Sequence, residues 1–284
     1  MISSLTKTIE GNLSLGLACQ FITSHEDLFS SGVGLKFDIS KANYVDPAVV
    51  ALCVQMNKKH QGLMEIINPA DRTKNIIDRV MGIRNPGTIL PANHIADHLN
   101  GDLISKIKFW LRTTLGRHYK ANKNATATQI ELTAVELINN VIDHAQSALG
   151  GTIVGASFSS RKHIELTVID FGATIPGTLK YLYPSLSDHE LIAKSMEFGV
   201  SRRKGESHNY GRGLDIVKNY ALQDRDCSLV IISNNGFASI TNAELPHCRP
   251  GKFRFNGTIV KCNFSEKFVS QIIEEPEGES DLEF

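Results

Sequence analysis

Residues 136–145 read Glu-Leu-Ile-Asn-Asn-Val-Ile-Asp-His-Ala, and the sequence around them predicts one long amphipathic helix, from about Gln129 to Ala148. At roughly 100° per residue, four polar side chains share one side of this helix: Glu136, Asn140, Asp143 and His144. The opposite side carries Ala134, Ile138, Val141, Ile142 and Ala145 and is expected to face a core. Asn, Asp and His are poorer helix formers than the residues that usually fill solvated helix sides. The polar side is therefore a candidate functional surface, with an ordinary solvated side as the alternative.

A second feature is the stretch 168–172, Val-Ile-Asp-Phe-Gly. An apolar strand is expected to end at Asp170, and Gly172 follows where the chain turns closely past another group. A carboxylate in this place can accept a hydrogen bond from an exocyclic amine such as that of adenine. An ordinary turn aspartate is the alternative interpretation.

A third feature is the stretch 209–217, Asn-Tyr-Gly-Arg-Gly-Leu-Asp-Ile-Val. Two glycines precede a helix with an apolar stripe, so bare backbone N–H groups are expected at the helix N-terminus. That arrangement suits phosphate. Taken alone, a Gly-x-Gly at a helix start is a weak signal.

Together and in this order, the three features resemble the motifs of the GHKL ATPases, the superfamily of gyrase, certain heat-shock chaperones, histidine kinases and MutL. The resemblance covers roughly residues 102–264. Glu136 and Asn140 match the Glu-x-x-x-Asn box, and Asp170 and Gly172 match the first glycine box. The second glycine box and a late Gly-Thr are matched by Gly211, Gly213, Leu214, Gly257 and Thr258.

This resemblance implies an ATP- and Mg²⁺-binding α/β sandwich of two layers, the Bergerat type. In the family the Asn coordinates magnesium, the Glu orients or deprotonates the attacking group, and the Asp holds adenine. Asn140 is thus the expected metal ligand and Glu136 the expected catalytic residue. The resemblance places the nucleotide against Asn140, Asp143, His144, Asp170, Gly172, Ile175, Ser201, Arg202, Lys204, Gly211, Arg212, Gly213, Leu214 and Thr258.

The stretch 198–204 resembles the mobile ATP lid of that family, within an expected irregular segment at 172–210. The first glycine box usually reads Asp-x-Gly-x-Gly, but Thr174 stands here in place of its second glycine. Its side chain is expected to crowd the lid hinge, which argues against fast turnover more than against nucleotide binding. Gyrase-like hydrolases receive an essential lysine from a following domain, which is not expected here, so slow hydrolysis or phosphotransfer is favoured.

The remaining elements follow from hydrophobic periodicity. A helix is expected at 104–119, a polar linker at 120–128 and a further helix from Gly211. Strands are expected at 152–159, 164–170, 229–233, 252–255 and 258–264, the last two paired with each other.

The front of the chain predicts strand, helix, strand, helix, at 35–39, from Pro47, at 63–67 and at 74–81. These pieces resemble a STAS domain, the fold of anti-sigma-factor antagonists. Where phosphorylatable members carry Ser or Thr after the aspartate, this chain has Pro47, Ala48 and Val49, which argues against a phospho-switch. A generic α/β packing domain remains the alternative.

We therefore expect an N-terminal segment (1–33), a STAS-like domain (34–100), a GHKL domain (101–270) and a disordered acidic tail (271–284). With 30 basic and 30 acidic residues, nothing indicates binding to nucleic acid or an anionic membrane. The five scattered cysteines are typical of reduced thiols. The apolar stretch 13–22 resembles a lipoprotein signal only weakly, because Gly16 stands where leucine is usual, so a cytoplasmic location is expected.

Two classes of function remain open. The first is an enzyme, either a slow Mg²⁺-dependent ATPase or a serine/threonine kinase like the anti-sigma-factor kinases. The second is a non-catalytic module that binds ATP or ADP and thereby displays a surface to a regulatory protein partner. A histidine kinase is disfavoured, because the string at 189–192 lacks the expected Arg and Pro and follows the first glycine box. The resemblance also leads us to expect a homodimer.

Overall fold

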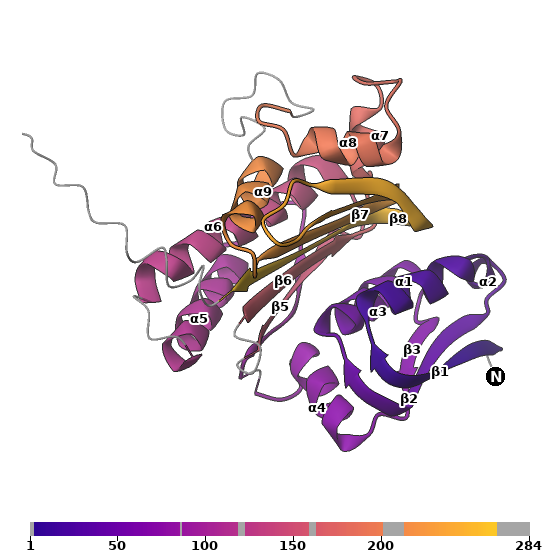
Figure 1. Ribbon diagram of the computed structural model, residues 1–284. Coiled ribbons are helices and arrows are strands. Elements are labelled where there is room, and N and C mark those ends of the chain that lie inside the picture. Colours follow the sequence, from indigo (N-terminus) through magenta and orange to yellow (C-terminus); the bar gives the residue numbers. More distant parts are fainter. Residues whose placement is uncertain (1–2, 86, 119–122, 159–162, 201–212, 266–284) are drawn as a thin grey trace, which may run out of the picture.

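The computed structural model describes residues 3–85, 87–118, 123–158, 163–200 and 213–265. Within these ranges the strands form a three-stranded parallel sheet and a five-stranded antiparallel sheet (Figure 1). The protein is therefore of mixed α/β class, as predicted. Asp170, the residue expected at a strand end, belongs to the five-stranded sheet.

The parallel sheet has the strand order β1-β2-β3, with β1 (Ser4–Leu13), β2 (Gly34–Val45) and β3 (Met64–Ile67). Helices α1 (Leu15–Ser24) and α2 (Asp27–Ser30) connect β1 to β2, α3 (Pro47–Lys59) connects β2 to β3, and α4 (Asp71–Val80) follows. Parallel strands require such crossovers. Helix α3 begins where predicted, because Pro47 suits a first turn and the Asp46 carboxylate accepts the Ala48 N–H at 2.9 Å.

The antiparallel sheet has the order β4-β5-β6-β8-β7. Its strands are β4 (Ile89–Ile95), β5 (Gly151–Phe158), β6 (His163–Asp170), β7 (Ser228–Ile240) and β8 (His247–Ser265). The helices of this part are α5 (Gly101–His118), α6 (Lys123–Asn140), α7 (Ile175–Leu179), α8 (Asp188–Ser195) and α9 (Gly213–Gln223). Helix α6 continues directly into a π-helical turn, η1 (Val141–Ala145).

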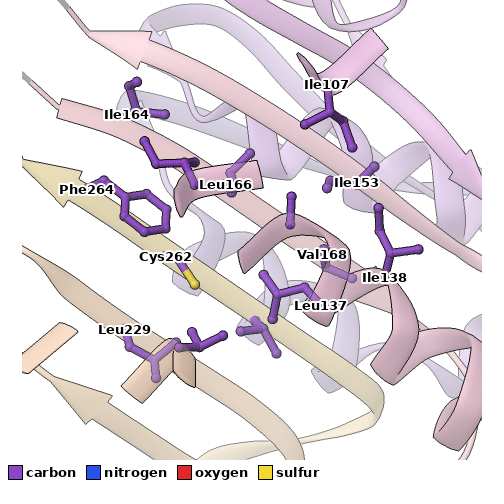
Figure 2. Packing of buried hydrophobic residues seen from close by; sticks show 14 of the residues in the cluster. Ile107, Leu137, Ile138, Ile153, Ile164, Leu166, Val168, Leu229, Cys262 and Phe264 are labelled. Carbon is purple, nitrogen blue, oxygen red and sulfur yellow. The ribbon is translucent and has the colours of Figure 1, made fainter. Parts of the chain in front are cut away.

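One face of the antiparallel sheet packs against α5, α6 and α9. Alternate residues of β6, namely Ile164, Leu166 and Val168, point to this face, as the period of a strand requires. Figure 2 shows Ile107 of α5 and Ile138 of α6 in this cluster. The apolar side predicted for α6 is thus the buried one.

The opposite face of the same sheet packs against α1 and α3 (Figure 1). Ile169 of β6 and Ile259 of β8 share one buried cluster with Ile22 of α1 and Leu52 of α3. The resulting layer order is helices, antiparallel sheet, helices, parallel sheet. Both faces of the antiparallel sheet are therefore covered, the second by the front part of the chain.

A buried ion cluster joins α3 to this second face. The Lys261 ammonium of β8 lies 2.8 Å from an oxygen of Asp46 and 2.8 Å from an oxygen of Glu165 of β6. Both carboxylates are 8% exposed. Burial alone would lower the pKa of Lys261, but the two carboxylates outweigh it and raise that pKa. Lys261 is therefore held charged between the layers.

Three local predictions are wrong. Lys123–Thr128 belong to α6 and are not a linker, and the segment expected to be irregular contains α7 and α8. The strands expected at 252–255 and 258–264 are one strand, β8, which pairs with β7 and not with itself. Asn256-Gly257 looks like a hairpin turn, but a Cβ at Gly257 would overlap the Asp170 carbonyl oxygen, so this glycine serves close strand packing.

Each sheet contains strands from more than one of the expected segments. Strand β1, from segment 1–33, joins the parallel sheet, whereas β4, from segment 34–100, pairs with β5 in the antiparallel sheet. Residues 271–284, the expected acidic tail, lie outside the described residues. In the part of the chain that the structure describes, no helix is both long and apolar enough to cross a membrane.

Candidate functional site

Three polar side chains form a row across neighbouring strands where β6 ends. Asp170 of β6 pairs in register with Thr258 of β8, which pairs with Ser233 of β7. All three are buried, and the Thr258 and Ser233 hydroxyls lie 3.0 Å apart. By strand alternation they point to the same face as Val168, the face that α6 covers. We call these three residues the strand-end row.

Asp170 is the titratable member of the row. One of its oxygens accepts the Gly172 N–H at 2.8 Å, yet the side chain is only 4% exposed. Burial raises the pKa of Asp170 to about 7, although the Gly172 hydrogen bond acts in the opposite direction. A carboxylate that is costly to ionise and lies at a strand end is a candidate for a ligand-binding group.

The turn after Asp170 is packed against the end of η1. A Cβ at Gly172 would overlap the Ala145 carbonyl oxygen, and the Ala173 N–H donates to that same oxygen. Gly257 approaches the turn from β8. Both glycines therefore allow close contact between chain segments. Through these contacts the turn that carries Asp170 lies against the helix that carries the candidate polar side.

Gly172→Ala is expected to lower the free energy of unfolding by about 1–3 kcal/mol, because the added methyl group meets rigid backbone. Gly16→Ala is the control, since a Cβ there meets nothing within 4 Å and lies inside a helix. Urea unfolding of both variants measures the difference. Equal stability of Gly172→Ala and wild type would contradict the close packing of the turn.

The polar side of α6 and η1 is neither fully buried nor open. Glu136, Asn140, Asp143 and His144 are all partly buried, whereas Ala134, Ile138, Val141 and Ala145 are buried and Ile142 is partly buried. Burial, and then the nearby Asp143 carboxylate, raise the pKa of Glu136. This side therefore holds two carboxylates close enough to influence each other.

Asn140 is one of six residues, among those described, with a buried side-chain atom that lacks a hydrogen-bond partner. Its amide nitrogen is buried and finds no hydrogen-bond partner among the described residues. An unsatisfied buried polar atom costs about 1–3 kcal/mol, so it commonly marks a place where a ligand or water completes the bonding. Asn140 is followed immediately by η1, and π-helical turns are frequent at functional sites.

Helix α9 packs beside α6, with Val217 and Ala221 in the shared core and Leu214 partly buried against it. Gly213 is the first residue of α9. The remaining residues expected to contact phosphate lie outside the described residues, and they are Ser201, Arg202, Lys204, Gly211 and Arg212. Helix α9 is thus placed next to the candidate helix.

Ile175 and Thr174 lie at the start of α7. The Ile175 N–H donates to the Ser233 hydroxyl at 2.9 Å, which ties α7 to the strand-end row. Thr174 is the N-cap of α7, and its hydroxyl accepts the Gly177 N–H at 2.9 Å. Thr174, which stands where the resemblance expects a second glycine, therefore caps a helix, and its hydroxyl is bonded locally.

Helix α8, in the segment expected to be irregular, is anchored to the β7–β8 pair. One Asp188 oxygen accepts the side-chain N–H of Asn234 at 2.9 Å and the backbone N–H of Asn235 at 3.2 Å. A Cβ at Gly236 would meet Ile192 of α8 at 2.6 Å. This part of the segment is a packed element and not an irregular loop.

Ser233 is the site residue that the sequence did not indicate. Its only signal was a polar residue at the end of the apolar strand predicted at 229–233.

Across the described ranges, no group of three or more His, Cys, Asp or Glu could hold a metal ion. Magnesium bound with phosphates needs only one or two protein ligands, so Asn140 with its oxygen fits such an ion.

Comparison with protein-family models finds no match, and comparison with curated proteins finds none either.

Proposed function

We propose that this chain binds ATP with Mg²⁺ between the polar side of α6–η1 and the strand-end row, as a protein of the GHKL type. The observation that carries the proposal is the buried Asp170 carboxylate, which lies at a strand end on the α6 face. Its turn contacts the end of η1. A motif-bearing helix over an antiparallel sheet also supports a Bergerat-type fold for this part of the chain.

The roles follow from the chemistry of each group. Asp170 would accept a hydrogen bond from the adenine amine, with the Thr258 and Ser233 hydroxyls beside it. The Asn140 carboxamide would hold the ion, which when bound neutralises phosphate charge. Glu136 would orient the attacking water or hydroxyl and accept its proton, and a raised pKa suits a general base working near neutrality.

The reaction type, location, partner and oligomeric state are part of the same proposal. The chain acts as a slow Mg²⁺-dependent ATPase or as a serine/threonine kinase, in the cytoplasm, on a regulatory protein partner, and it pairs as a homodimer. The front part, with its helical crossovers, is proposed as a STAS-like module. The second candidate is a nucleotide-gated binding module without turnover. The segment 174–195 favours it, because Thr174 caps α7 and Asp188 of α8 is bonded to Asn234 of β7. A segment held in this way has little freedom to close over a nucleotide.

Calorimetry with ATP and ADP, with and without Mg²⁺, tests the proposal. We expect binding of both nucleotides, strengthened by Mg²⁺. A phosphate-release assay and a phosphotransfer assay on the same protein then separate the two candidates, because the binding module shows neither activity. Absence of nucleotide binding at millimolar concentration would overturn the proposal.

Glu136→Gln is expected to lower turnover about a hundredfold, as loss of a general base does. Nucleotide affinity should stay within about threefold of wild type, because an uncharged side chain of the same shape keeps the packing around position 136. Glu131→Gln, on the same helix but paired with Lys108 at 3.0 Å, is the control and should keep turnover. An equal loss in both variants would remove Glu136 from the catalytic role.

A further inference from the structure

The C-terminal end of α3 reaches the Asp170 turn from the face opposite the candidate site. The Lys59 ammonium lies 4.7 Å from the centre of the Phe171 ring. Phe171 follows Asp170 directly, and its ring packs against that of Phe255 at 5.2 Å. A cation over an aromatic ring is attracted by the charge distribution of the ring. One residue of the front part of the chain therefore contacts the turn that would hold adenine.

Lys59 is itself held in place. One Glu26 oxygen lies 2.9 Å from its ammonium, and the other accepts the side-chain N–H of Asn256 at 3.0 Å. Asn256 precedes Gly257, which packs against the Asp170 carbonyl. Glu26, Lys59, Phe171 and Asn256 thus close a ring of contacts around the turn. Both ion-pair partners are about one-quarter exposed, at 25% for Lys59 and 24% for Glu26, so the pair is partly shielded from solvent.

The same helix also contacts the start of β5, next to the end of η1. Gln55 lies one helical turn before Lys59 and is fully buried. Its amide donates to the Gly150 carbonyl at 3.1 Å and accepts the Thr152 hydroxyl at 2.8 Å. These residues flank the start of β5, just after η1, where Gly151 packs against Val141. Side chains on one side of α3 therefore contact two places in the chain. The first is the start of β5, which follows η1, and the second is the turn that follows β6.

An apolar residue would be the ordinary choice at the position of Gln55, because a buried carboxamide is costly unless both of its ends are bonded. Here both ends are bonded, and to the backbone and side chain of a different layer. Such bonds fix position in a way that apolar contacts do not. Gly151 at the start of β5 pairs in register with Asp170 of β6, so α3 contacts both strands at the same end of the sheet.

We propose that Lys59 is a positioning residue for the nucleotide, and that α3, which Gln55 fixes to the start of β5, thereby couples the front part of the chain to nucleotide affinity. This proposal rests on the proposed function, since it assumes that the Asp170 turn holds adenine. The coupling is reciprocal: a change at α3 alters nucleotide affinity, and nucleotide binding alters the protection of α3.

The test compares Lys59→Gln with Lys59→Arg, which keeps the cation, and with Lys41→Gln, whose ion pair with Glu10 is exposed. Two readouts are taken on the full chain: ATP affinity with Mg²⁺ by calorimetry, and hydrogen exchange of the Gly172 and Ala173 amides. We expect Lys59→Gln to weaken affinity about three- to tenfold and to speed exchange at both amides. Lys59→Arg should restore most of both, and Lys41→Gln should change neither.

The outcomes are distinguishable from those of the proposed function. If the wild type binds ATP but Lys59→Gln binds equally well with unchanged exchange, this inference is overturned while the proposed function stands. If exchange speeds up without a change in affinity, Lys59 is merely structural and the inference again fails. If the wild type binds no ATP, the proposed function falls, and this inference falls with it.

Discussion

Asp170→Asn is expected to weaken ATP binding about ten- to a hundredfold, because a hydrogen bond from adenine to a charged carboxylate is replaced by a neutral one. The same substitution is expected to make the nucleotide-free protein more stable at pH 8. If Asp170 had a purely structural role, its substitution would instead make the protein less stable. The combination of weaker binding and higher stability is therefore diagnostic of a residue kept for its ligand.

The sign of the stability change follows from the pKa. In the folded protein burial raises the pKa of Asp170 from 3.8 to about 7. Between these values the folded state holds a proton that the unfolded state has released, so stability falls as the pH rises from about 4 to 7 and is level above that. Three pKa units correspond to about 4 kcal/mol, the upper limit of the effect. Asparagine does not titrate, so the variant lacks this loss.

Urea unfolding at pH 5 and pH 8 measures this difference, and calorimetry measures the affinity. Asp102→Asn is the control, since its carboxylate is largely exposed in a pair with Lys106 and is expected to change neither quantity. Unchanged ATP affinity in Asp170→Asn would count against the site. A pH dependence identical to that of wild type would show that Asp170 is not the buried titrating group.

The parts of the fold that follow a simple period could be predicted. The apolar side of α6 repeats every three to four residues, and Ala134, Ile138 and Val141 are buried as this requires. Asp170 could be placed at a strand end because the apolar run before it has the length of one strand. Local pattern was sufficient in both places.

Other parts depend on contacts between distant segments. Asn256-Gly257 continues a strand because Gly257 must pass the Asp170 carbonyl, a contact that no local pattern contains. Thr174 could be compared with a motif, but its role as an N-cap depends on α7, which the sequence did not predict. Ser233 became a site candidate only when the register placed it beside Thr258.

Lys261 is the clearest case of this limit. A lysine between Val260 and Cys262 in an amphipathic strand is ordinarily expected to face solvent. The side of β8 that carries it is covered by α3, however, and the ammonium meets two buried carboxylates there. Because one of these is the N-cap of α3, the lysine also ties the start of that helix to the sheet.

Lys261→Met is accordingly expected to lower the free energy of unfolding by about 3–5 kcal/mol, because removing one member of a buried ion cluster leaves the others uncompensated. The methionine fills a similar volume, so the loss reports charge and not a cavity. Asp46 and Glu165, both 8% exposed, would then face each other without a cation. We expect the pKa of the Asp46 carboxyl, already raised by burial, to rise further.

The control for this prediction is Lys41→Met, which breaks the Lys41–Glu10 pair at 2.9 Å, where the side chains are 66% and 73% exposed. Exposed pairs contribute about 0–1 kcal/mol, so this variant should unfold near the wild-type urea midpoint. Each variant removes one lysine from a β-strand, so the difference between their free energies of unfolding reports the effect of burying the ion pair. If Lys261→Met also unfolds within about 1 kcal/mol of wild type, the two layers are held by their apolar contacts alone, and the ion cluster does not fix α3 on the sheet.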